Sequence, residues 1–105
     1  MAADTFTEFV RDQLRTLEDL EFRSMFGGYG LYLKDRFFAI LFKGKLYFKT
    51  CPESLLDYRD AGSKPFVYKK AGKKTVKLKN YYDVPVDVLE NRRALEKWAR
   101  RAAAG

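Results

Sequence analysis

The residue types that most often carry out chemistry are scarce in this sequence of 105 residues, which contains one cysteine and no histidine. Without histidine the chain cannot form a Ser-His-Asp or Cys-His pair or a histidine metal site, and a single cysteine excludes a zinc finger and an internal disulfide. Cys51 directly precedes Pro52, where a helix N-terminus would lower the pKa of the thiol. Because no base and no second cysteine accompany it, we interpret Cys51 as a half-buried structural residue.

The carboxylates offer no general acid/base pair either. Such a pair needs two carboxyl groups whose surroundings move their pKa values apart. Here the carboxylates fall mostly on the ends and faces of predicted helices, where Glu53 and Asp87 suit the helix dipole. We therefore expect a protein that is not an enzyme, with no catalytic residue, no metal ligand and no cofactor.

Three glycines in Gly27-Gly28-Tyr29-Gly30 suggest a phosphate-binding loop at first sight. Such a loop needs the order G-x-G-x-x-G, or a following Lys-Ser or Lys-Thr, and it opens a helix. Here the next residues, 31–33, continue as a predicted strand. We interpret the glycines as a bulge, or as a place where another backbone comes close.

Lysine is the one reactive residue type that clusters. The net charge is +7, the excess lies within residues 23–82, and no acidic residue falls between Lys64 and Lys79. The segment is either a footprint for an anionic partner such as a nucleic acid, bound weakly and without sequence specificity, or a solvated edge hairpin whose lysines discourage strand addition. The candidate surface for an anionic partner consists of Lys69, Lys70, Lys73, Lys74, Lys77 and Lys79.

Hydrophobic periodicity predicts the elements that position these residues. Apolar residues at helical spacing follow a capping-box pattern and predict a helix over about 5–20. Alternation broken by tight turns predicts three antiparallel strands within residues 23–50. A helix over about 52–61, two strands around a turn at 70–73, and a helical segment from Pro85 complete the order α-β-β-β-α-β-β-α. This order favours an α+β fold of two layers, one antiparallel sheet with helices on one face.

The middle strand of this sheet, residues 37–42, is apolar on both faces. It is therefore either a central strand that is covered on both sides within the chain, or a strand whose second face meets a partner.

The chain length indicates one domain, residues 1–105. No apolar run reaches the roughly 20 residues of a membrane helix, and the N-terminus leads into polar, acidic sequence without a secretory signal. A single cysteine suits a reducing compartment. We expect a cytoplasmic protein without a membrane partner.

One segment resembles a known family. The run Arg23, Ser24, Met25, Phe26, Gly27, Gly28, Tyr29 and Gly30 is similar to the signature of the N-terminal domain of the TfoX/Sxy competence regulators. The similarity continues through residues 36–39, 46–49, 58–62, 65–68, 81–85 and 98–102. It implies a two-layer α+β domain like the secretion-chaperone-like fold, a structural role for the signature, and no catalytic or metal residue. The regulators carry a second, C-terminal domain, and because this sequence stops at Gly105 we expect a single-domain member.

The resemblance implies a bacterial cytoplasmic regulator that co-activates competence genes alongside the cAMP receptor protein. We therefore expect a non-enzymatic regulatory domain that binds another protein, such as a transcription factor or an RNA polymerase complex, and we also consider a homo-oligomer. The alternative is a basic protein that binds nucleic acid through the hairpin from Lys64 to Lys79.

Overall fold

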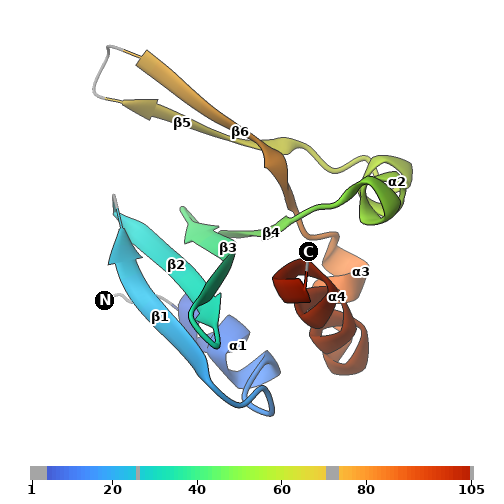
Figure 1. Ribbon diagram of the computed structural model, residues 1–105. Helices are drawn as coiled ribbons and strands as arrows, with labels where there is room; N and C mark the ends of the chain where they lie inside the picture. The colour runs from blue at the N-terminus through green and yellow to red at the C-terminus, as the bar shows by residue number, and fades with distance from the viewer. Residues whose placement is uncertain (1–4, 26, 71–73, 105) are drawn as a thin grey trace.

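The computed structural model describes residues 5–25, 27–70 and 74–104 (Figure 1). It confirms an α+β fold in which helices accompany one open antiparallel sheet. The strand order in the sheet is β1-β2-β3-β4-β6-β5. The elements are α1 (Thr5–Gln13), β1 (Leu20–Met25), β2 (Gly28–Leu33), β3 (Arg36–Phe42), β4 (Lys45–Lys49), α2 (Pro52–Asp60), β5 (Pro65–Lys70), β6 (Lys74–Asp83), α3 (Val86–Leu89) and α4 (Arg92–Ala104).

The predicted order of helices and strands is confirmed, with one strand more than the periodicity indicated. The helix predicted over 5–20 ends at Gln13, and Leu14 and Leu17 remain buried in the turns that follow it. Asp19 then takes a left-handed conformation, with φ of 66°, and β1 begins. The predicted helix was too long because apolar residues keep the helical spacing for several positions after α1 has ended.

Two tight turns fix the register of the first strands. Lys34 and Asp35 both have positive φ between β2 and β3, and Lys43 and Gly44 both have positive φ between β3 and β4. Two successive left-handed residues make a type I′ turn, whose twist matches that of a hairpin. The turns that the sequence predicted at these positions are thus two-residue hairpin loops.

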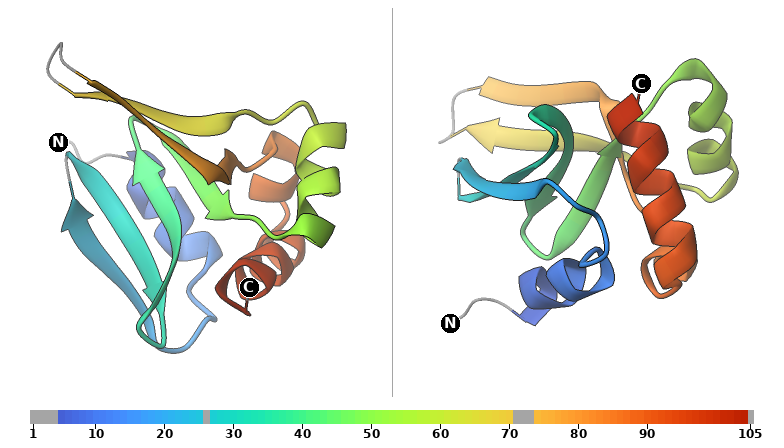
Figure 2. Two further views of the ribbon diagram at one scale, coloured as in Figure 1. Left: turned by 45° about the horizontal axis from the view of Figure 1, so that its top comes forward. Right: turned by 60° about the horizontal axis from the view of Figure 1, so that its bottom comes forward.

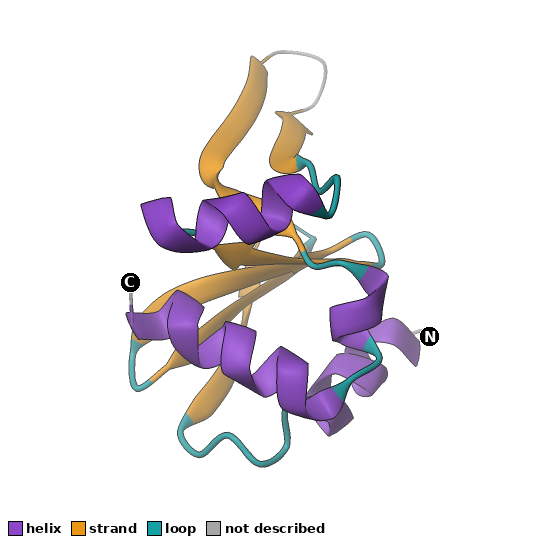
Figure 3. Cartoon of the chain, turned by 90° about the vertical axis from the view of Figure 1, so that its right-hand side faces the viewer, coloured by secondary structure: helices purple, strands orange, loops and turns teal. Residues whose placement is uncertain are grey.

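The helices build the main core on one face of the sheet. Helix α4 runs along β3 and β4 (Figure 3), and its Leu95 and Ala99 are fully buried. Helix α1 adds Val10, and α2 adds Tyr58, whose ring lies 4.8 Å from that of Trp98. These contacts place all three helices around a single core together with Phe38 and Phe48 on the strands.

The second face of β3 is covered by the far end of the same sheet. Phe66 of β5 is fully buried and its ring centroid lies 5.7 Å from that of Phe42 and 4.9 Å from that of Tyr47. In a flat sheet β5 and β3 would be three strand spacings apart, about 14 Å. The sheet must therefore curl, and Figure 2 shows β5 and β6 running at an angle to β1, β2 and β3.

Two irregularities of register accompany this curl. One separates the pairs Leu31–Ala39 and Tyr32–Phe37, which leaves Phe38 as an extra residue on β3. The other lies where Pro65 pairs with Tyr82 and Phe66 with Leu78, which leaves residues 79–81 as extra residues on β6. A bulge bends its strand and increases the local twist, so both devices favour a curved sheet.

The apolar character of strand 37–42 is accounted for within the chain, because Ile40 and Phe42 pack against Phe66.

Replacing Phe66 with alanine tests this curl. Since the ring is fully buried between Phe42 and Tyr47, Phe66→Ala should lower the free energy of unfolding by about 3–5 kcal/mol. Val67, the next residue, has an exposed side chain, and Val67→Ala should change stability by about 0.5 kcal/mol or less. Denaturant titration measures both, and equal effects of the two substitutions would show that β5 does not close over β3.

Candidate interaction surfaces

The lysine hairpin, formed by β5 and β6, gathers most of the predicted basic residues. Lys69 and Lys70 lie on β5, and Lys74, Lys77 and Lys79 lie on β6. Lys70 pairs with Lys74, and Lys77 pairs with Val67, whose side chain is exposed. Lys73 lies outside the described residues. The hairpin extends away from α1 and α4 (Figure 1), so its backbone brings the lysine positions together at one end of the molecule.

The signature segment forms the first hairpin of the sheet. Arg23, Ser24 and Met25 lie on β1, and Gly28, Tyr29 and Gly30 lie on β2. Gly27 connects the strands with φ of 83°, and Phe26 lies outside the described residues. The segment leads into a strand, so no helix N-terminus is available there to hold a phosphate.

At two of these glycines an added Cβ would come too close to neighbouring atoms. A Cβ on Gly28 would come within 2.3 Å of the carbonyl oxygen of Leu41. A Cβ on Gly30 would come within 2.6 Å of the sulfur of Met25 and 3.0 Å of the ring of Phe37. The glycines therefore let β2 approach β3 and let aromatic side chains cross the sheet surface above them.

Arg23 organises a polar cluster next to these glycines. Its guanidinium lies 4.1 Å from the centroid of the Tyr32 ring and pairs with Glu21 at 2.6 Å and with Asp35 at 3.0 Å. The hydrogen bond with Glu21, more than any other contact, raises the pKa of Arg23. This cluster was not predicted from the sequence because β1 was not predicted, although the alternation in residues 20–23 is the signal for such a strand.

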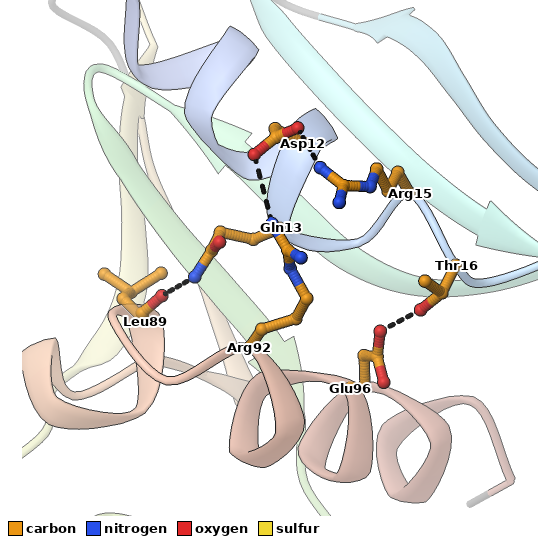
Figure 4. A network of polar contacts seen from close by, with 7 residues as sticks. All are labelled: Asp12, Gln13, Arg15, Thr16, Leu89, Arg92 and Glu96. Atoms are coloured by element: carbon orange, nitrogen blue, oxygen red, sulfur yellow. Dashed lines mark hydrogen bonds and ion pairs between the residues drawn. The ribbon is translucent and has the colours of Figure 1, made fainter.

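A second polar network joins α1 to α4 (Figure 4). Asp12 accepts from Arg15 at 2.7 Å and from Arg92 at 3.3 Å. The hydroxyl of Thr16 donates to the carboxylate of Glu96. The amide of Gln13, which is buried, donates to the carbonyl of Leu89 at 2.9 Å. Apart from Asp12 and Arg15, these partners are far apart in the sequence, so no local pattern predicts them, and they dock α1 and the turn after it against α3 and α4.

Cys51 caps α2 without forming a catalytic arrangement. Its backbone N–H donates to Oγ of Ser54 at 2.9 Å, and its sulfur lies 3.5 Å from the same oxygen. The hydrogen bond with Ser54 lowers the pKa of the thiol. The prediction that Cys51 lies at the N-terminus of this helix is confirmed, and its contacts with Ser54 are those of a helix cap.

Two further carboxylates also have structural partners. Asp57 pairs with Arg101 at 2.8 Å, and Asp83 accepts from the backbone N–H of Lys64 at 2.7 Å. Burial raises the pKa of Tyr58 and raises that of Tyr81 to about 12, so both phenols stay protonated at neutral pH. Among the described residues, no three cysteine, aspartate or glutamate side chains come together as a metal site would require.

A recess of about 530 Å³ lies beside the end of α4 and is open to solvent. Its lining mixes charges of both signs, Glu18 together with Lys34, Arg36 and Arg100. Arg36 is held there by a hydrogen bond of 3.4 Å to the carbonyl of Ala103. Within the described ranges, each helix is too short or too polar to span a lipid bilayer.

The close approach at Gly28 gives a second test. Gly28→Ala should lower the free energy of unfolding by about 3 kcal/mol, because the new Cβ forces β2 away from the Leu41 carbonyl. The control is Gly44→Ala, where φ is 73° but no atom lies within 4 Å, and left-handed strain costs about 1 kcal/mol. Chemical denaturation compares them, and a smaller loss at Gly28 than at Gly44 would contradict the packing described.

Comparison with known proteins identifies the family. The family model described as the TfoX N-terminal domain matches residues 12–105. Protein Sxy of Escherichia coli K12 is 33% identical over 90 residues, which cover 86% of this chain and 42% of that protein. The DNA transformation protein TfoX1 of Aliivibrio fischeri is 37% identical over 62 residues, which cover 59% of this chain and 29% of that protein. The chain thus spans less than half the length of these curated relatives. It belongs to the TfoX N-terminal domain family.

Proposed function

We propose that this chain is a non-enzymatic regulatory domain that acts by binding another protein in the control of competence. The observation that carries the proposal is the family match over residues 12–105, with relatives that include a DNA transformation protein. The partner proposed is a component of transcription, either a transcription factor or an RNA polymerase complex, in the cytoplasm.

The chemistry of the described residues supports a binding role. The groups with shifted pKa values are tyrosines shielded by burial, a cysteine that caps a helix and an arginine held by two carboxylates. None of these pairs a nucleophile with a base, and site-based assignment of an enzyme needs such a pair. A domain of this kind contributes by presenting a surface on a rigid sheet.

Affinity capture tests the protein partner. The tagged chain, incubated with native lysate from a competent bacterial culture and treated with nuclease, should retain a specific protein at a stoichiometry that mass spectrometry quantifies. The partner should be retained equally by the variant in which Lys69, Lys77 and Lys79 become glutamate. Loss of every specific protein after nuclease treatment would contradict the proposal and would favour a nucleic-acid partner.

The lysine hairpin supports a second candidate function, direct binding of nucleic acid. The hairpin extends from the body of the molecule, with lysine positions on both strands and a net charge of +7 on the chain. A basic projection of this kind contacts phosphates without reading bases.

Salt dependence tests this second candidate. If four lysines meet phosphates, the log-log slope of affinity against salt should be about −3.6, which lowers affinity roughly 100-fold between about 50 and 200 mM salt. The triple variant Lys69→Glu, Lys77→Glu, Lys79→Glu should abolish binding in a fluorescence-anisotropy titration. A control with the same change of charge, Arg93→Glu, Lys97→Glu, Arg100→Glu on the exposed face of α4, should retain it. An equal loss of nucleic-acid binding in both variants would show that the net charge of the chain, and not the lysine hairpin, determines the affinity.

A further inference from the structure

The two edges of the sheet differ in how they are protected. Edge β5 begins with Pro65, has a register shift next to it, and carries Lys69 and Lys70. Proline, bulges and lysines are the usual devices that prevent an edge strand from pairing with another chain. Edge β1 contains none of them, and its pairing with β2 runs through six consecutive residues without a shift.

The side chains of β1 form a pattern that is complementary to itself. Glu21 and Arg23 lie on one face and are about half exposed, with Phe22 between them on the opposite face. When two copies of this strand pair antiparallel with Phe22 opposite Phe22, Glu21 of each copy lies opposite Arg23 of the other. A pairing centred on Glu21 or on Arg23 would instead oppose like charges, which destabilises a sheet.

The same register also suits the apolar side of the strand. Leu20 and Phe22 are partly buried against the main core, so both retain some exposed surface at the edge. Opposite residues of an antiparallel pair point to the same face, so this register keeps the helices of both copies on one side of the joint sheet. Arg11, which lies 4.1 Å from the centroid of the Phe22 ring, would flank the contact from α1.

We propose that β1 is a homodimer interface, at which two copies of this chain join their sheets edge to edge with Phe22 at the two-fold axis. The partner at this edge is a second copy of the chain, because the charge pattern of the strand is complementary to itself. The lysine hairpins then lie at the two far ends of the joint sheet, where dimerisation leaves them free.

Charge reversal tests this proposal through complementation. Sedimentation equilibrium should show reversible dimers as the concentration rises from about 10 to about 500 µM, since an interface of one strand is small. Glu21→Arg and Arg23→Glu, made separately, should each raise the dissociation constant at least about tenfold, because like charges then face each other twice. An equimolar mixture of the two variants should associate as a heterodimer, with an affinity close to that of the unchanged chain.

A matched control separates the interface from the fold. Asp35→Ala removes a partner of Arg23 within the chain but leaves the β1 pattern intact, so it should dimerise normally. Circular dichroism should show that each variant is folded, and rescue in the mixture cannot be explained by misfolding. A chain that stays monomeric at every concentration would overturn the proposal, as would single variants that dimerise normally or a mixture that fails to associate. If β1 pairs only with an extended strand of another protein, the chain alone would stay monomeric at every concentration.

Discussion

The contact on which the rest of the structure depends is the packing of Phe66 over the second face of β3. A strand that is apolar on both faces must be covered twice, and the helices cover only one face. Phe66 supplies the other cover by bringing β5 back toward β3, with Tyr47 and Phe42 around its ring. The extra residues that the register shifts leave on β3 and on β6 are the local deviations that let a sheet of six strands curl this far.

This closure decides which surfaces are left for function. The face of Ile40 and Phe42 is taken up within the chain, so a partner has to use an edge, a helix surface or the projecting hairpin. The glycines of the signature belong to the same arrangement. Gly30 leaves room for Phe37, whose ring lies 5.2 Å from that of Tyr32 and 5.4 Å from that of Tyr81. The family signature thus contributes to an aromatic layer that continues toward the lysine hairpin.

Much of the fold could be predicted because local patterns report it directly. Alternation and turn residues indicated the hairpins around Lys34 and Lys43, and Pro52 indicated the start of α2. The first strand was not predicted, because buried Leu14 and Leu17 continue the helical spacing after α1 has ended. The sequence did not decide whether the second face of β3 is covered within the chain or by a partner. The answer depends on the curvature of the sheet, which comes from bulges that hydrophobic periodicity does not reveal. In the candidate site, the lysine positions could be predicted because they cluster in the sequence. The Arg23 cluster could not, because Arg23 meets Asp35 only through the pairing of β1 with β2 and the turn after β2.

The most direct test of this account is a set of nuclear Overhauser contacts between aromatic rings in solution. The curled sheet predicts cross-peaks between the ring protons of Phe66 and those of Phe42 and Tyr47, and between the rings of Phe37 and Tyr81. Absence of these cross-peaks, in a protein whose β5 and β6 amides still show antiparallel pairing, would contradict it. The second face of β3 would then be open, and it would become the first surface on which to look for a partner.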